Sequence, residues 1–235
     1  MQTHLAFVRV AAQQGVQLLV FPELSLTGYE LLQLAAHVLD ADAAALAPLR
    51  QAARDHGVTL VVGAPVAAAR AGDLPCIGAW VLHADGTTTL YRKRHLHGSE
   101  TQFASAGEED ALVLPLAGIA TGLAICADAT HPAHAHAAAG AGAALYASGA
   151  LISENGYGPE SAQLQGYARE HAMAVLLANH GGPSGGYTSA GRSAFWAPDG
   201  RQVVAAPGPG QCLVVATRAA DGNWSGRVVP LDLPA

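Results

Sequence analysis

A repeated pair of segments constrains the fold more than any other feature of this chain. Residues 3–14 place apolar side chains at helical spacing, and residues 16–21, VQLLVF, then form a short apolar run. The same pair recurs at residues 40–57 and 58–66, where VTLVVGAPV is the apolar run. Short apolar runs of this kind are typical of buried strands. The pattern therefore predicts strands with helices packed over them.

The rest of the chain continues as a mixed α/β sequence. Asp-Gly pairs at 85–86 and 199–200 lie between strand-like runs and predict hairpins. Further strands are expected within residues 111–126, 143–151, 174–179 and 212–217, and further helices at 133–139 and 160–172. With 235 residues, 51% of them hydrophobic and 13% charged, the chain can bury one sizeable core. We expect a single domain spanning residues 1–235.

Charge and cysteine content narrow the functional class. The formal net charge of −6 gives no electrostatic reason to bind nucleic acid or an anionic membrane. Three cysteines at wide spacings, Cys76, Cys126 and Cys212, are typical of free thiols in a reducing compartment. The sequence shows no leader and no apolar run long enough to cross a membrane, so the cytoplasm is the expected location. A small or neutral partner is expected.

Three reactive side chains follow apolar strand-like runs. Glu23 follows VQLLVF, Lys93 follows the strand that ends in LYR, and Cys126 ends GLAIC. Loops at strand ends are the usual place for functional residues in layered α/β folds. If they converge, they supply a base, an oxyanion stabiliser and a nucleophile for acyl transfer. Each also has an ordinary explanation: a loop carboxylate, a solvated edge lysine and a small apolar core residue.

The segments that carry these residues resemble a known family. FPELSLTGY at 21–29, YRKRHL at 91–96 and GLAICAD at 122–128 are similar to the three signature segments of the nitrilase superfamily, the carbon–nitrogen hydrolases with a Glu-Lys-Cys triad. The resemblance continues through AREHAMAVLLANHGG and the closing hairpin to about residue 217. It implies an α/β fold, a four-layer α-β-β-α sandwich, and a homodimer or higher homo-oligomer.

The resemblance also implies a division of roles. Glu23 is the expected general base, Cys126 the nucleophile, and Lys93 the group that stabilises the anionic intermediate, helped by the backbone N–H of Ala127. Family members often carry a second glutamate after the lysine, and Glu100 is the matching residue. The resemblance further implies a reaction that passes through a thioester on the cysteine and requires no metal or other cofactor.

The substrate is less constrained than the reaction. A small linear amide or omega-amide that yields a carboxylic acid and ammonia is favoured; nitriles and N-carbamoyl compounds remain alternatives, as does an idle member that only binds a small metabolite. Tyr29, Phe103 and Tyr187 are expected to line the pocket. A carboxylate end of the substrate would need an arginine, and the candidates, each equally explained as a surface residue, are Arg92, Arg94 and Arg192.

Three further expectations concern local structure. We expect Asp128 to stabilise the turn that carries Cys126 through a pair with Arg169, and the histidines of HPAHAH at 131–136 to be solvated helix residues rather than metal ligands. The chain also begins inside the helix that follows the family's first core strand. Without that strand, an edge beside residues 16–21 would be uncovered. A late start of the sequence, cover by another segment or subunit, and tolerance of the loss all remain open.

Overall fold

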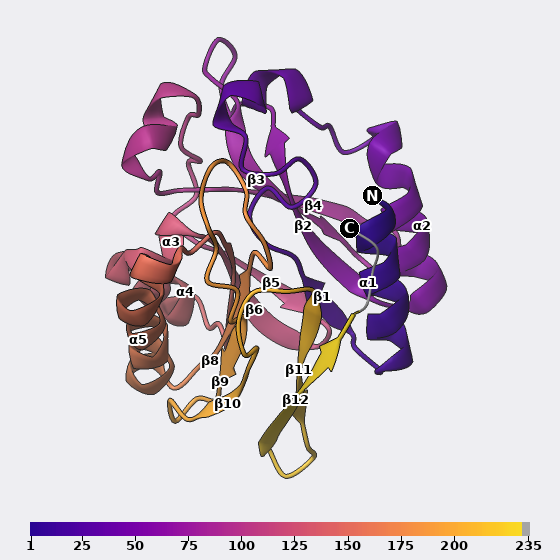
Figure 1. The fold of residues 1–235 in the computed structure, drawn as a ribbon, viewed down its shortest axis with the longest axis vertical. Helices are drawn as coiled ribbons and strands as arrows, with labels where there is room; N and C mark the ends of the chain where they lie inside the picture. The colour runs from indigo at the N-terminus through magenta and orange to yellow at the C-terminus, as the bar shows by residue number, and fades with distance from the viewer. Residues whose placement is uncertain (232–235) are drawn as a thin grey trace.

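Two β-sheets pack face to face, and helices cover the outer face of each. The computed structural model describes residues 1–231. Helices α1 (Gln2–Gln13) and α2 (Ala47–His56) lie on one flank of the molecule, and α4 (Pro132–Gly140) and α5 (Glu154–His171) lie on the other (Figure 1). The predicted four-layer α-β-β-α sandwich is confirmed.

The first sheet has the strand order β1-β2-β3-β4. β1 pairs with β2 in parallel, and the other neighbours pair antiparallel. Its strands are β1 (Leu18–Val20), β2 (Thr59–Val66), β3 (Cys76–Leu82) and β4 (Thr88–Arg92). The predicted turn at residues 85–86 joins β3 to β4. Gly86 adopts there the positive φ of 91° that a residue with a side chain would adopt only at a cost.

The second sheet has the order β10-β9-β8-β7-β6-β5, and β11 and β12 form a separate hairpin. The three central strands β6, β7 and β8 run parallel. The strands are β5 (Leu112–Leu116), β6 (Ile119–Ile125), β7 (Leu145–Ala150), β8 (Ala174–Asn179), β9 (Ala194–Trp196), β10 (Gln202–Ala205), β11 (Cys212–Arg218) and β12 (Trp224–Pro230). The short helices are η1 (Leu31–His37), η2 (Ala44–Leu46), η3 (Gly98–Gln102) and α3 (Ala127–Thr130).

Successive residues of a strand direct their side chains alternately into the core beneath the helices and the core between the two sheets. On β2, Leu60 and Val62 belong to the core beneath α1 and α2, whereas Val61 points into the core between the sheets. On β7, Tyr146 packs beneath α4 and α5, and Ala147 belongs to the inter-sheet core. Because both faces of these strands are covered, their sequences are largely apolar on both faces instead of alternating, with Thr59 and Ser148 as buried polar exceptions.

Two helix boundaries differ from the expected ones. α5 begins at Glu154, six residues before the expected start, even though Pro159 lies inside it. Tertiary contacts outweigh the low helix propensity of this first segment. The hydroxyl of Tyr157 donates to the carbonyl of Arg192 at 2.7 Å, and the Arg192 guanidinium lies 5.0 Å from the centre of the Tyr157 ring. The second difference concerns α2: the helical pattern was expected from residue 40, but the chain is α-helical only from Ala47, after the 3₁₀ turn η2.

β1 lies at the edge of its sheet. It pairs with β2, and within residues 1–231 no strand pairs with its other edge. β12 is the last strand of the described chain, and residues 232–235 lie outside the described part. None of the helices described is long and apolar enough to cross a membrane.

Candidate active site

Glu23 lies in the loop that follows β1. The parallel pairing with β2 continues to Phe21, whose N–H donates to the carbonyl of Val61 at 2.9 Å. Gly63 of β2 lets this loop pass close by, because a Cβ there would lie 2.3 Å from the backbone nitrogen of Leu24. The Glu23 side chain is fully buried as a result.

Lys93 lies directly after β4 and is held between two carboxylates. Its Nζ lies 2.6 Å from Glu23 Oε1 and 2.7 Å from Glu100 Oε1, and all three side chains are fully buried. Glu100 lies on η3, where the His97 N–H donates to its Oε2 at 2.7 Å. The hydroxyl of Tyr29 donates to Glu100 Oε1 at 2.5 Å. The structure therefore brings together the predicted Glu23, Lys93 and Glu100.

Cys126 lies at the sharp turn between β6 and α3. Its φ of 46° is unusual for a residue with a side chain, which is typical of strained functional positions. The backbone N–H of Cys126 donates to the carbonyl of Gly149 at 3.0 Å and thereby ties the turn to β7. Its Sγ lies 3.9 Å from the Leu151 carbonyl oxygen. Glu23 Oε2 is buried without a hydrogen-bond partner, so one carboxylate oxygen remains free to accept a proton.

Gly149 is the point where the two sheets bring these elements into contact. A Cβ on Gly149 would lie 2.5 Å from the Phe21 carbonyl oxygen and 3.4 Å from the Glu23 backbone nitrogen. The same residue accepts the hydrogen bond from Cys126. A glycine at this position therefore allows the Glu23 loop and the Cys126 turn to meet.

Asp128 joins the Cys126 turn to the Lys93 loop. Its Oδ1 accepts from the backbone N–H groups of Arg94 at 3.0 Å and His95 at 2.7 Å. Its Oδ2 accepts from the Ile125 N–H at 3.0 Å and the Tyr91 hydroxyl at 2.7 Å. The expected pair with Arg169 is wrong, because all these partners come from β4, β6 and the loop after β4. The Arg169 side chain packs against Gly200 instead.

His134 is not the solvated residue that was expected. It is buried on α4, with Nδ1 2.8 Å from the Tyr146 hydroxyl and Nε2 2.9 Å from the Tyr91 hydroxyl. Because Tyr91 donates its proton to Asp128, it accepts from Nε2–H, which leaves Nδ1 to accept from Tyr146. Burial lowers the pKa of His134, in keeping with a neutral ring. His131 and His136 are exposed as expected.

The charges of the site set the protonation states. Burial raises the pKa of Glu23 to about 6; Lys93 opposes this rise, and Glu100 adds to it. Burial raises the pKa of the Cys126 thiol well above its ordinary value, the charge of Glu23 raises it further, and Lys93 acts in the opposite direction. Burial alone would lower the pKa of Lys93, but the negative charges of Glu23 and its neighbours outweigh burial and raise it. At neutral pH the site therefore holds a carboxylate, an ammonium and a neutral thiol.

The predicted pocket residues lie in different environments. Tyr29 is buried and contacts Glu100, as described above, and its ring meets that of Tyr187 edge-on, with centroids 5.8 Å apart. Tyr187 is 43% exposed. Phe103 follows η3 and packs on the inter-sheet core. Ala127 is the first residue of α3, so its N–H has no carbonyl partner one turn earlier in the helix.

The segment that carries Tyr187 lies against the Glu23 loop. The Tyr29 N–H donates to Ser184 Oγ at 2.8 Å, and His180 Nε2 lies 2.7 Å from the Glu23 carbonyl oxygen. His180 is a site residue that the sequence did not predict, because nothing in its local pattern marks a contact across 157 residues.

The arginine candidates have protein partners in this structure. Arg192 pairs with Glu154, and Arg94 Nε lies 3.3 Å from Asp110 Oδ1. Arg92 Nε donates to the Ala67 carbonyl at 3.0 Å. Within residues 1–231 no group of three or more His, Cys, Asp or Glu side chains is arranged to hold a metal ion.

Comparison with known proteins gives a consistent result. The sequence profile of the family described as carbon-nitrogen hydrolase matches residues 1–221. A curated relative, called nitrilase, from Pyrococcus abyssi (strain GE5 / Orsay) is 30% identical over 197 residues, which cover 81% of this chain and 72% of the relative.

Solved structures of an amidase from Nesterenkonia sp. AN1 have the same fold. A cysteine-to-alanine mutant in complex with butyramide superposes with a TM-score of 0.79 and is 28% identical, covering 88% of this chain and 80% of that one. A cysteine-to-serine mutant of the same amidase, described as belonging to the nitrilase superfamily, has a TM-score of 0.79 and 27% identity, covering 99% of this chain and 84% of that one.

Proposed function

Because this chain belongs to the carbon–nitrogen hydrolase family and is a carbon–nitrogen hydrolase, we propose that it hydrolyses a small linear amide or omega-amide by way of a thioester on Cys126. The observation that carries the proposal is the fully buried ion cluster of Glu23, Lys93 and Glu100 beside a neutral thiol. A buried ammonium or carboxylate without a partner would be strongly disfavoured in the protein interior. Here Lys93 contacts both Glu23 and Glu100, and such buried charged clusters are typical of functional sites.

In the acylation step, Cys126 Sγ attacks the amide carbonyl carbon. A new S–C bond forms as Glu23 takes the thiol proton, and the carbonyl oxygen becomes an oxyanion. The Lys93 ammonium and the Ala127 N–H stabilise this negative charge. The C–N bond then breaks, and the leaving nitrogen receives the proton from Glu23. Ammonia departs and a thioester remains.

Deacylation repeats the sequence with water. Glu23 takes a proton from the water as its oxygen attacks the thioester carbon, and the resulting intermediate expels the sulfur. The proton then returns to the thiolate, which restores the neutral thiol and releases the carboxylic acid. The Glu23 pKa of about 6 suits both directions of proton transfer, because the group is mostly ionised at pH 7 and not far from protonation. Glu100 also contacts the Lys93 ammonium and, in this proposal, helps to place the water.

The substrate class rests on the neighbours. The Nesterenkonia amidase is described in complex with butyramide and, as a glutamate-to-glutamine mutant, with acrylamide added at its active-site cysteine. Short aliphatic amides are therefore the first compounds to assay. The relative called nitrilase makes nitrile hydrolysis the second candidate.

The decisive experiment measures ammonia release from short amides, omega-amides, N-carbamoyl compounds and nitriles. We expect turnover with an amide, and near-complete loss in Cys126→Ala, Glu23→Gln and Lys93→Ala. Cys76→Ala is the matched control, because Cys76 is a buried thiol on β3, outside the cluster. Turnover of nitriles alone would replace the amide assignment.

Labelling with iodoacetamide separates an enzyme from an idle binding protein. Rapid, stoichiometric alkylation of Cys126 at neutral pH, lost in Glu23→Gln, is expected. Three equally slow thiols together with no turnover on any of these compounds would refute the catalytic proposal.

A further inference from the structure

The backbone directly after Glu23 is strained. Leu24 is fully buried and adopts a φ of 49°, in the left-handed region that residues with a side chain rarely enter. Such a conformation persists only where the surrounding contacts hold it in place. The peptide group between Glu23 and Leu24 therefore needs a partner that fixes its orientation.

His180 is that partner. Its Nε2 lies 2.7 Å from the Glu23 carbonyl oxygen, and because a carbonyl only accepts, Nε2 carries the proton. Within residues 1–231 the Glu23 carbonyl has no other hydrogen-bond partner. Burial lowers the pKa of His180, and the bond to the Glu23 carbonyl opposes this change. The ring is therefore neutral at neutral pH, and its single N–H is used on the backbone of the proposed base.

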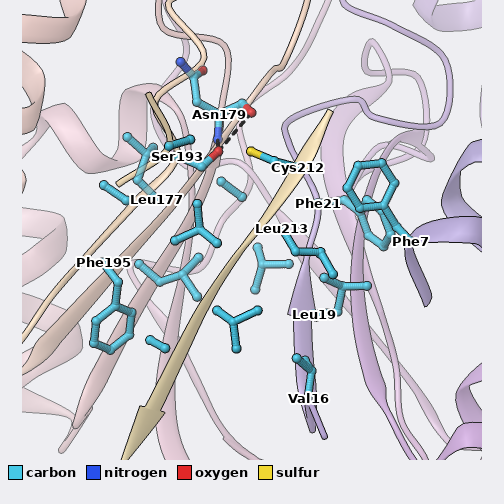
Figure 2. A pocket seen from close by; sticks show the side chains of 18 of the residues that line it. Phe7, Val16, Leu19, Phe21, Leu177, Asn179, Ser193, Phe195, Cys212 and Leu213 are labelled. Carbon is cyan, nitrogen blue, oxygen red and sulfur yellow. Dashed lines mark hydrogen bonds between the residues drawn. The ribbon is translucent and has the colours of Figure 1, made fainter. Parts of the chain in front are cut away.

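The backbone of His180 is itself fixed on both sides. Its N–H is shared between Asn179 Oδ1 at 3.1 Å and the Ala150 carbonyl at 3.2 Å. Its carbonyl accepts from the Ser189 hydroxyl at 2.6 Å. Asn179 is anchored in turn, because its own N–H donates to Ser193 Oγ at 2.9 Å (Figure 2). The imidazole therefore projects from a segment that is held at several points.

The Asn179 side chain reaches the peptide group beside the nucleophile. Its Oδ1 accepts from the Ile152 N–H at 2.7 Å. Its Nδ2 donates to the Ile152 carbonyl at 3.1 Å and to the Gly191 carbonyl at 2.7 Å. The Ile152 N–H belongs to the same peptide group as the Leu151 carbonyl, whose oxygen lies 3.9 Å from Cys126 Sγ. Asn179 therefore fixes the orientation of the carbonyl that the thiol contacts.

From these contacts we propose that Asn179 and His180 form one positioning unit for proton transfer between the base and the nucleophile of the site. His180 fixes the peptide group after Glu23, and Asn179 fixes the peptide group that faces Cys126. The inference rests on the proposed function, because this proton transfer is the step that the unit serves. Two residues adjacent in sequence thereby hold two loops that are far apart in the chain. An error of about 1 Å in a positioned reaction can cost about a hundredfold in rate.

Replacing His180 with phenylalanine tests the unit, because the variant keeps a ring and removes the donor. We expect kcat for ammonia release to fall about tenfold or more, with KM changed less than about twofold. In His180→Gln the amide nitrogen takes nearly the place of Nε2 and donates to the same carbonyl, so kcat should recover to within about threefold of the native value. His56→Phe is the matched control, because His56 is exposed at the end of α2.

The pH dependence of iodoacetamide alkylation gives a readout that needs no turnover. In the native protein the rate should rise as Glu23 ionises, with its pKa of about 6, because this group takes the thiol proton. His180→Phe keeps the titratable groups that face Glu23, which are Lys93, Glu100, Cys126 and Tyr29. A displaced carboxylate no longer takes the proton, so alkylation should begin at least about one pH unit higher in this variant. The glutamine variant and the control should keep the native profile.

A double-mutant cycle tests whether the two residues act as a unit. Asn179→Ala should also slow alkylation, because the peptide group that faces the thiol loses its partner. In the double variant Asn179→Ala/His180→Phe, the two losses should add to less than their sum, since both residues set the same separation. Losses that add fully would show two independent contacts and overturn the unit.

Three results for His180 would also overturn the proposal. One is a native kcat together with a native alkylation profile in His180→Phe. Another is an equal loss in the phenylalanine and glutamine variants with a lower melting temperature in both, because the histidine would then serve folding alone. The third is a change confined to KM, which would place His180 in contact with the substrate.

A milder variant keeps the test open if His180→Phe does not fold. Ser189→Ala removes the hydroxyl that holds the His180 carbonyl, so alkylation should again begin at higher pH, and an unchanged profile there would overturn the proposal. Alkylation is measured without a substrate, so it tests the positioning unit even where ammonia release fails. A native alkylation profile in these variants leaves the proposed hydrolysis intact.

Discussion

Replacing Tyr29 with phenylalanine tests how the ion cluster is held in place. The hydroxyl of Tyr29 donates to Glu100 Oε1 at 2.5 Å, and the same oxygen lies 2.7 Å from Lys93 Nζ. Tyr29→Phe keeps the ring and removes only this donor. We expect the Glu100 carboxylate to lose its fixed orientation, and the Lys93 ammonium to be positioned less well for the oxyanion.

The size of the effect follows from the type of hydrogen bond. A hydrogen bond to a charged acceptor contributes about 1.5–3 kcal/mol. At about 1.4 kcal/mol for each tenfold change in rate, kcat/KM should fall by about tenfold to a hundredfold. Glu100 keeps its bonds from Lys93 and the His97 N–H, so the free energy of unfolding should fall by an amount at the lower end of that range, about 1.5 kcal/mol.

Tyr187→Phe is the matched control. Its ring packs edge-on against Tyr29, but the residue is 43% exposed. Ammonia release at saturating and limiting substrate, with thermal melting of both variants, gives the comparison. An unchanged kcat/KM in Tyr29→Phe, or an equal loss in both variants, would refute the assignment of Tyr29 as a positioning residue.

The pH dependence of kcat/KM should follow Glu23, because with a pKa of about 6 this base is mostly ionised only above pH 6. We expect kcat/KM to rise about tenfold per pH unit below pH 6 and to level off above pH 7. A flat profile between pH 5 and 7 would contradict this role. The free energy of unfolding should instead fall as pH rises, because the pKa of Glu23 in the folded state lies above its ordinary value of 4.5. Urea titrations should show a loss of about 2 kcal/mol as pH rises from below 4.5 through 6. This loss should be absent in Glu23→Gln. Asp128→Asn places an amide N–H₂ group among N–H and O–H donors. We therefore expect a free energy of unfolding about 2–4 kcal/mol lower in urea titrations, and much slower alkylation of Cys126. Native values for both would show that Asp128 does not hold the turn. Gly149→Ala should reduce ammonia release at least about tenfold, because its Cβ would meet the Phe21 carbonyl oxygen at 2.5 Å and separate Glu23 from Cys126. The control is Gly166→Ala, in an open position on α5. It should retain activity, and its free energy of unfolding should rise by about 0.5–1 kcal/mol.

The proposed reaction also explains why the buried network behind Cys126 is polar. Asp128 and His134 connect the Lys93 loop, the Cys126 turn and α4 by directed hydrogen bonds. An apolar core could fill the same space, but it would not fix the angle between two loops. Such networks favour one arrangement over others when every member is satisfied. Here the arrangement sets the distance between the ammonium and the thiol.

Much of the fold is determined locally by the sequence. The apolar runs at residues 16–21 and 58–66 are strands because continuous hydrophobic residues require cover on both faces, and Gly57 ends α2 because it adopts the left-handed conformation at little cost. The motifs around Glu23, Lys93 and Cys126 likewise identify the family, because residue types at strand ends can be recognised without coordinates.

Contacts between distant segments were decided only in the tertiary structure. The sequence shows neither that Asp128 bonds to the loop after β4 rather than to Arg169, nor that His134 is buried between Tyr91 and Tyr146. Local periodicity reports on neighbours within a few residues. Hydrogen-bond partners depend instead on how the two sheets stack, because that stacking places Asp128 beside the loop after β4 and His134 beside Tyr91.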